Sequence, residues 1–419
     1  MKVSVTDLRP ARYKWAVVAM LWSICFFNYA DRQAIFSVFP LLEKELHLGP
    51  VELGLLGSAF AWVYGLGAPL AGVIVDRIKR RSAILGGLQV WSIICVATAI
   101  SRNFSHLIFF RAAEGAGETF YYPASVSMLS DYHGKATRSR ALGFLQTSVY
   151  MGTIGGGFFA GLIGQRYGWR SSFVVFGGLG ILLGFVLRKY LREPVRGMSD
   201  DAPPQQRIPV GEAFRLILSN RSVLCLMGAF VCANFVAVVL LSWMPKFLYE
   251  RFGMSLAAAG LAATVYAQLA SMAGASIGGW LADTLARHTP RGRVMVQASA
   301  VLLAAPFVLL CGLAPSLTLV IVALTGWGFC KGFYDANIFA SPFDVIPPQA
   351  RGTVAGLMNC VGWFAGGGTA PLVVGLVARE RGLGFAIAAA SGVYVLAGLL
   401  LATCLLFLPR RHPAAVHTA

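Results

Sequence analysis

The chain has 419 residues, of which 57% are apolar and only 13% are charged, and its formal net charge is +17. A soluble domain carries about 25% charged residues and about 45–50% apolar ones, so this composition excludes an ordinary soluble globular protein. The apolar residues fall in continuous blocks, each long enough to cross a bilayer as a helix, and not in the alternating pattern of transmembrane strands. The composition therefore predicts an all-α membrane protein.

In chain order, the apolar blocks predict twelve transmembrane helices, six on either side of one long polar segment. The first six lie near residues 15–40, 53–75, 82–101, 104–131, 139–165 and 170–191. The second six lie near residues 221–250, 258–284, 293–313, 317–346, 352–378 and 383–409. The polar segment predicts a cytosolic linker at 192–220, between an N-terminal bundle (1–191) and a C-terminal bundle with its tail (221–419).

The positive charges predict the orientation of these spans. Most of the 35 lysines and arginines lie in loops and tails on the side of the N-terminus. Such residues stay on the cytoplasmic side, so we expect a multi-pass protein of the inner (plasma) membrane with both termini in the cytosol. This distribution explains the net charge without a nucleic-acid partner.

Neither a metal site nor an enzyme active site is predicted. The 8 cysteines are single residues in or beside apolar blocks, without a CxxC pair, and are typical of packing residues rather than disulfides or metal ligands. No nucleophile stands in a pattern with a base, so we expect no enzyme activity and no cofactor.

The two halves of the chain resemble each other at two landmarks. A run from glycine to aspartate follows the second span of each half, at 72–76 and 279–283. An arginine opens the fifth span of each half, and both Arg140 and Arg351 precede three consecutive glycines by the same spacing. Parallel six-helix repeats place a substrate site near the membrane midplane. The sequence therefore predicts two pseudo-symmetric six-helix bundles around one central cavity, and we expect a monomer.

Several motifs resemble those of known transporters. The segment Gly72…Asp76-Arg77…Arg80-Arg81 resembles the cytoplasmic loop signature of the major facilitator superfamily. Four further motifs are similar to the anion:cation symporter family: Tyr29-Ala30-Asp31-Arg32, Arg111…Gly115-Ala116-Gly117-Glu118…Pro123, Gly168-Trp169-Arg170 and Trp243-Met244-Pro245…Gly253-Met254-Ser255. This resemblance implies the major facilitator fold and transport of organic anions such as sugar acids, usually with protons. The pattern of the fourth span is also similar to spinster-type lipid transporters.

Charged residues inside the spans are candidates for proton coupling, because a charge at the bilayer centre costs at least about 2.5–3.5 kcal/mol. Arg111, Glu114 and Glu118 are spaced i, i+3, i+7 and therefore share one face of the fourth span. Glu118 lies near the midplane, where desolvation favours a protonated carboxyl. We expect Glu118 to be the main coupling site and to trade Arg111 for a proton, with Asp31 as its partner and Glu114 as a further candidate. A permanent buried ion pair is the other interpretation.

Two cations inside the spans are candidates for binding the substrate. Arg32 projects about 100° away from Asp31 around the helix, and its guanidinium suits bidentate binding of a carboxylate. The resemblance implies the same role, and a structural pair with the fourth span is the alternative. Lys331 lies as deep in the tenth span as Glu118 does in the fourth. It either faces the cavity and binds substrate or is neutralised by Asp335, one turn on.

Uncharged polar and aromatic residues within the spans are candidates for lining the cavity, since each polar side chain needs a partner there. They are Tyr29, Tyr64, Gln146, Tyr150, Asn234, Asn359 and Trp363. The resemblance implies substrate contacts for Tyr29, Tyr64, Gln146 and Asn359. Hydrogen bonds between helices account for each of them equally well.

Charged residues in the loops after the second and eighth spans predict a cytosolic gate. They are Asp76, Arg77, Arg81 and Asp283. We expect them to hold the inner ends of the helices together when the carrier faces outward. The alternative for the basic ones is a role in topology alone.

Taken together, these features predict a secondary active transporter of a small organic anion, a sugar acid or another carboxylate, that works by proton symport with alternating access. Its partners would be the anion, protons and the lipid bilayer. The alternative is a spinster-like carrier of a lipid, a lysolipid or another small molecule, which would have an apolar cavity in place of a cationic one. A membrane sensor that does not transport is a third class, in which buried coupling carboxylates would serve little purpose.

Overall fold

The computed structural model describes residues 10–75, 77–195 and 209–409. Every regular element within these ranges is a helix, and the helices form two compact units. The N-terminal unit contains α1 to α8 together with Gly253–Leu261, and the C-terminal unit contains the remaining described residues. The helices of the N-terminal unit are α1 (Pro10–Ser37), α2 (Phe39–Leu46), α3 (Pro50–Val75), α4 (Arg80–Thr98), α5 (Phe104–Glu118), α6 (Tyr121–Tyr132), α7 (Lys135–Tyr167) and α8 (Trp169–Tyr190).

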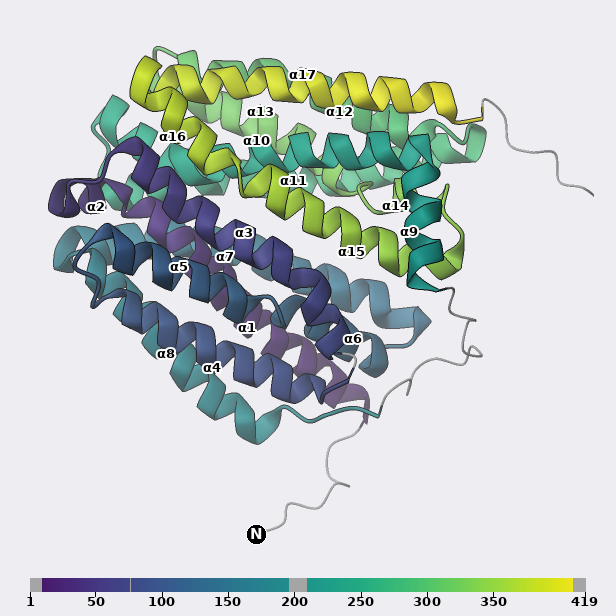
Figure 1. Ribbon diagram of the computed structural model, residues 1–419, viewed down its shortest axis with the longest axis horizontal. Coiled ribbons are helices and arrows are strands. Elements are labelled where there is room, and N and C mark those ends of the chain that lie inside the picture. Colours follow the sequence, from purple (N-terminus) through teal and green to yellow (C-terminus); the bar gives the residue numbers. More distant parts are fainter. Residues whose placement is uncertain (1–9, 76, 196–208, 410–419) are drawn as a thin grey trace, which may run out of the picture. The chain divides into compact units, whose positions relative to one another are not determined.

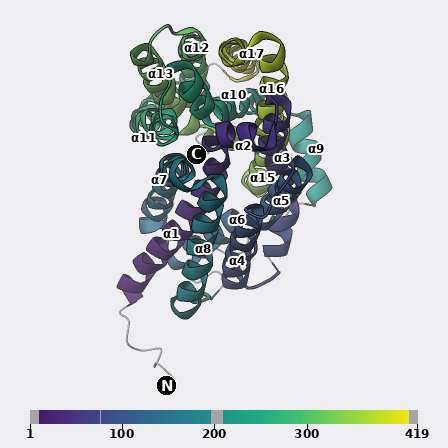
Figure 2. The same cartoon turned by 90° about the vertical axis from the view of Figure 1, so that its left-hand side faces the viewer.

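The C-terminal unit has a similar sequence of long and short helices. They are α9 (Val210–Ser219), α10 (Arg221–Phe252), α11 (Leu256–His288), α12 (Gly292–Leu313), α13 (Leu317–Asp335), α14 (Ala340–Phe343), the 3₁₀ turn η1 (Pro348–Ala350), α15 (Arg351–Val361), the π-helical η2 (Gly362–Gly367), α16 (Ala370–Arg381) and α17 (Leu383–Phe407). Within this unit α12 packs against both α13 and α17, as Figure 2 shows.

Close backbone contacts hold the helices of the N-terminal unit together. The helix α7 lies along α1, and α8 lies along α4 (Figure 1). A Cβ atom on Gly156 of α7 would collide with the backbone of Ala30 in α1. Gly152 of α7 is equally close to the backbone of Phe26. Small residues allow this approach between helices in lipid, so these two glycines serve helix packing.

Nine of the helical segments in the described ranges are long and apolar enough to cross a membrane, judged by length and composition. They correspond to nine of the twelve spans predicted from the sequence. The other three, at 15–40, 104–131 and 139–165, are helical but carry several polar or charged residues, and the second of them is divided into α5 and α6. The count of twelve therefore stays a prediction.

The segment expected to be a polar linker contains a helix. In α9, Ala213 and Ile217 are 1% and 0% exposed and belong to a core cluster with Val223 and Val354. These two residues are four apart and form a narrow apolar stripe, which the polar composition of 192–220 concealed.

The two units repeat local structure at corresponding places. Gly168, between α7 and α8, has φ 84° and ψ 156°, and Gly382, between α16 and α17, has φ 83° and ψ 156°. Only glycine adopts this region without strain. The side chain of Asn103 caps the start of α5, and that of Ser316 caps the start of α13. These matched turns extend the sequence repeat to the backbone.

Candidate functional site

Charged side chains of α1 and α5 meet inside the N-terminal unit. Arg32 Nε donates to Glu118 Oε2 at 2.5 Å, and Arg111 is paired with Glu114. Asp31 completes the group, which we call the α1–α5 cluster. Its carboxyls and Arg111 are at most 1% exposed, and Arg32 is 8% exposed. A buried charge is costly without a partner, so losing one member of either ion pair would destabilise this unit.

Aromatic rings hold the two guanidinium groups in place. The Phe60 ring of α3 lies 4.9 Å from Arg32 Cζ and 4.9 Å from Arg111 Cζ, so it contacts both cations. Arg32 Cζ also lies 4.8 Å from the Tyr29 ring and 4.4 Å from the Tyr64 ring. Each cation–π contact contributes about 0.5–2 kcal/mol, depending on desolvation. The sequence did not single out Phe60, because an aromatic residue in an apolar span is typical of packing.

The α1–α5 cluster contains one more acid than base. Three carboxyls face two guanidiniums, so the cluster is neutral when it holds a single proton. Within the described ranges, neither oxygen of Asp31 has a hydrogen-bond partner, and one oxygen each of Glu114 and Glu118 also lacks one. The nearby Cys95 thiol donates to the carbonyl of Phe173 at 3.5 Å. Burying an ionised carboxylate without a partner costs several kcal/mol, which makes Asp31 the most favourable position for that proton.

The ion pair that Glu118 makes differs from the one expected from the sequence. The sequence indicated Arg111, two turns away on the same helix, but Arg111 is bound to Glu114, which is only one turn away. Glu118 is bound to Arg32. The pair between Arg32 and the fourth span, one of the two interpretations of Arg32, is therefore formed. Tyr29 and Tyr64 both lie against Arg32, and the predicted substrate contacts of these two residues stay a prediction.

The other polar candidates occupy varied positions. Tyr150 of α7 is 8% exposed, whereas Gln146, one turn earlier, is exposed. In the C-terminal unit, Asn234 of α10 donates to the carbonyl of Gly362 at 2.7 Å and so fixes α10 to η2. Asn359 and Trp363, on α15 and η2, are half-buried. The hydrogen bond of Asn234 matches the structural interpretation of that residue.

Lys331 and Asp335 form an ion pair within α13. Their side chains are 16% and 32% exposed, which is far more than in the α1–α5 cluster. Neutralisation of Lys331 by Asp335 was one of its two interpretations, and the pair is present. Substrate binding by Lys331 stays a prediction.

A buried ion pair joins the ends of several helices near the predicted gate. Arg80, at the start of α4, pairs with Asp131 of α6 and with Glu193 beyond α8. The side chain of Arg80 is 4% exposed and that of Asp131 is 9% exposed. The sequence had indicated the next residue, Arg81, whose amide donates to Glu193 Oε2 at 2.6 Å. Asp76 lies outside the described residues.

The C-terminal unit has a more exposed version of the same arrangement. Arg293 of α12 pairs with Asp283 of α11 at 2.9 Å and with Asp344, after α14, at 2.7 Å. Arg80 and Arg293 are as far apart along the chain as Asp131 and Asp344 are, so the two ion pairs are counterparts. Arg77 is exposed. The sequence did not predict four of these residues for the gate: Asp131, Glu193, Arg293 and Asp344. The repeat spacing relates Arg80 to Arg293 and Asp131 to Asp344, and no sequence signal indicated Glu193.

Membrane-length helices around a buried group of charges are typical of membrane transporters, where such charges mark substrate and proton pathways. Residues 21–371 match the family model of the Major Facilitator Superfamily, and the chain belongs to that superfamily. It is therefore a multi-pass membrane transporter and not an enzyme.

Relatives in this superfamily include carriers of sugar acids. The chain is 27% identical to a probable galactarate/D-glucarate transporter of Bacillus subtilis (strain 168), over 91% of this chain and 90% of the relative. It is 25% identical to a hexuronate transporter of the same organism, over 92% and 91% of the two chains. A bacterial homologue of the human lysosomal transporter Spinster shares the fold, with a TM-score of 0.83, 22% identity and coverage of 97% of this chain and 100% of that one.

Proposed function

We propose that the chain is a secondary active transporter that carries a small organic anion, a sugar acid or another carboxylate, together with protons. It would have twelve spans in two pseudo-symmetric six-helix bundles and would work by alternating access. We place it in the inner (plasma) membrane with both termini in the cytosol. The names of its relatives support the substrate class, and the buried α1–α5 cluster supports proton coupling.

The observation that carries the proposal is the buried pair between Arg32 and Glu118. Arg32 is the cation that suits a substrate carboxylate, and Glu118 already occupies it at 2.5 Å. A substrate anion can take this position only if Glu118 loses its charge. Protonation of Glu118 therefore frees Arg32 for the substrate, and departure of the proton restores the internal pair.

The charge balance gives the reason for symport. With one proton on Asp31, the cluster is neutral while Arg32 is bound to Glu118. A monovalent anion on Arg32 would add an uncompensated negative charge in a region of low dielectric, which is costly. A second proton, on Glu118, removes that cost. Uptake of one carboxylate group is thus linked to uptake of one proton.

The remaining candidates have supporting roles in this proposal. Tyr29 and Tyr64 orient Arg32, and Lys331 contributes a second cation for the substrate when it leaves Asp335. The ion pairs of Arg80 with Asp131 and of Arg293 with Asp283 and Asp344 act as the cytosolic gate together with Arg77 and Arg81. The sequence indicates the same role for Asp76.

Uptake by the purified protein in liposomes tests the proposal. Radiolabelled galactarate, glucarate, a hexuronate and a lysolipid are offered with and without an inward proton gradient. We expect accumulation of at least one sugar acid that depends on the gradient. Uptake of the lysolipid alone would favour the spinster-like alternative, and sugar-acid uptake that ignores the gradient would rule out proton coupling.

A further inference from the structure

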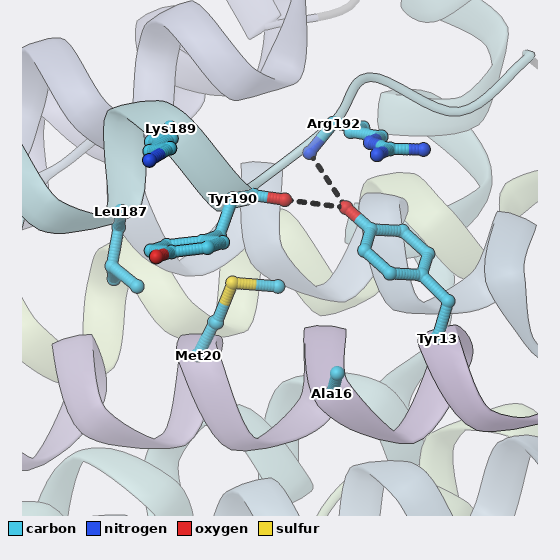
Figure 3. A pocket seen from close by; sticks show the side chains of 7 residues that line it. All are labelled: Tyr13, Ala16, Met20, Leu187, Lys189, Tyr190 and Arg192. Atoms are coloured by element: carbon cyan, nitrogen blue, oxygen red, sulfur yellow. Dashed lines mark hydrogen bonds between the residues drawn. The ribbon is translucent and has the colours of Figure 1, made fainter. Parts of the chain in front are cut away.

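A pocket of about 270 Å³ lies between the start of α1 and the end of α8, apart from the α1–α5 cluster (Figure 3). The residues that line it come from both helices and from the segment after α8: Tyr13, Ala16, Met20, Leu187, Lys189, Tyr190 and Arg192. The proposed function uses none of them.

Hydrogen bonds to backbone atoms make one wall of this pocket rigid. Tyr13 Oη donates to the carbonyl of Tyr190 at 2.8 Å and accepts from the amide of Arg192 at 2.9 Å, as Figure 3 shows. Tyr132 Oη donates to the carbonyl of Arg192 at 3.0 Å. Because these bonds use the backbone of Arg192, its side chain is not needed to close the junction. Its guanidinium lies over the Tyr13 ring at 5.4 Å.

The pocket has a cationic mouth and an apolar floor. Lys189 and Arg192 are exposed, and neither makes an ion pair with any residue in the described part of the chain. Ala16 and Met20 follow Tyr13 along α1, and Met20 is about 10 Å further along the helix axis. Leu187, which is 6% exposed, faces the same space from α8. A pocket with this polarity suits an amphiphile that has an anionic head.

The position of the pocket indicates a membrane interface. Tyr190, which lines the pocket, is 54% exposed, and Trp15, next to Ala16 along the chain, is 39% exposed. Such aromatic residues gather where a bilayer meets water. In the proposed topology, the lysines and arginines that precede α1 and follow α8 in the sequence put this end on the cytosolic side. Basic pockets between transmembrane helices on that side suit anionic lipid headgroups.

We propose that this pocket binds an anionic phospholipid of the cytosolic leaflet. The phosphate lies between Lys189 and Arg192, and an acyl chain passes Ala16 toward Met20 and Leu187. The bound lipid joins the first and last helices of the N-terminal unit at their cytosolic ends, so it stabilises that junction.

Native mass spectrometry of the purified protein, titrated with phosphatidylglycerol or phosphatidylcholine, tests the site. We expect wild type to retain phosphatidylglycerol in preference to phosphatidylcholine. The double variant Lys189→Gln/Arg192→Gln should bind phosphatidylglycerol about 30-fold more weakly, since each cation near the surface contributes roughly fivefold. The matched control Arg215→Gln/Arg287→Gln removes the same charge from exposed positions elsewhere and should bind like wild type.

A second variant separates a lipid from a soluble anion. Ala16→Trp fills the apolar floor without changing any charge, and we expect it to weaken phosphatidylglycerol binding as well. Equal binding by the double variant and its control would overturn the proposal. So would displacement of the lipid by inorganic phosphate combined with unchanged binding to Ala16→Trp, because the pocket would then recognise a soluble anion.

Discussion

The two units place their membrane-helix charges in opposite environments. In the N-terminal unit, the α1–α5 cluster is almost completely buried, draws on two helices and contains one acid in excess. In the C-terminal unit, Lys331 and Asp335 form a pair within one helix, balance each other and are partly exposed. A buried cluster with one more acid than base can take up a proton and become neutral. A balanced and partly exposed ion pair is already neutral and gains nothing from a proton. The comparison therefore supports the N-terminal unit as the place of the proposed proton coupling.

The two ion pairs that we propose for the cytosolic gate differ in burial in the same way. Arg80 and Asp131 have side chains that are 4% and 9% exposed, whereas Arg293 and Asp344 are 24% and 43% exposed. Breaking a buried pair by removing one partner costs about 3–5 kcal/mol, and an exposed pair contributes about 0–1 kcal/mol. Ion pairs at equivalent positions of the repeat should therefore contribute very different amounts to the free energy of unfolding.

The largest expected effect is that of Arg32→Ala. This substitution removes the cation that we propose for the substrate, and it should reduce binding of a transported sugar acid by about 100-fold or more. Arg32→Lys should bind more weakly than wild type, because lysine cannot bind a carboxylate in a bidentate manner. Isothermal titration calorimetry measures both. Wild-type affinity in folded Arg32→Ala would refute the role.

Glu118→Gln tests whether the coupled proton binds in the N-terminal unit. Glutamine mimics a protonated Glu118 and leaves Arg32 permanently released from its internal partner. Exchange of substrate between equilibrated compartments should persist, while accumulation driven by a pH gradient should disappear. Asp335→Asn, which neutralises the acid of the other unit, is the control and should retain accumulation. If Glu118→Gln accumulates substrate like wild type, the proton binds elsewhere.

The gate pairs predict a difference in stability between two equivalent substitutions. Arg80→Gln leaves Asp131 buried without its cation and should lower the free energy of unfolding by about 3–5 kcal/mol. Arg293→Gln should lower it by less than about 1 kcal/mol. Thermal unfolding in detergent, monitored side by side, compares them. Equal shifts would mean that burial does not distinguish the two pairs.

The smallest expected effect is that of Asp31→Asn on stability. The proton that makes the α1–α5 cluster neutral should lie on Asp31. An asparagine side chain has the same shape as a protonated aspartate and is also uncharged, so the substitution should change the free energy of unfolding by less than about 1 kcal/mol. Thermal unfolding at neutral pH measures the change. A loss comparable to that of Arg80→Gln would show that Asp31 is ionised and paired.

Much of this site could be predicted from the sequence, because charges inside apolar helices are conspicuous. Asp31, Arg32, Arg111, Glu114 and Glu118 were all predicted, and all belong to one cluster. Their pairing was not predictable, since it depends on how α1 faces α5, and that is a property of the fold.

Two other features had too weak a local signal. Phe60 has the same appearance as many packing residues, although its ring contacts two cations. Arg80 and Arg81 are equivalent in the sequence, and the direction in which α4 begins decides which of them is buried. The stripe formed by Ala213 and Ile217 was too short to indicate α9.

The π-helical turn η2 has a consequence for how this chain tolerates insertions and deletions. The amide of Gly368 bonds the carbonyl of Trp363 at 2.6 Å, five residues back, so this turn holds one residue more than an α-turn. Five residues of such a turn cover nearly the same rotation and rise as four residues of an α-turn. Removing one residue from η2 would therefore restore an ordinary turn and leave α16 in register, so the carbonyl of Pro371 would stay near Trp243 Nε1, which lies 3.2 Å away. The same deletion in a regular α-helix would rotate everything beyond it by about 100°, so η2 is a place where this chain tolerates the loss of one residue.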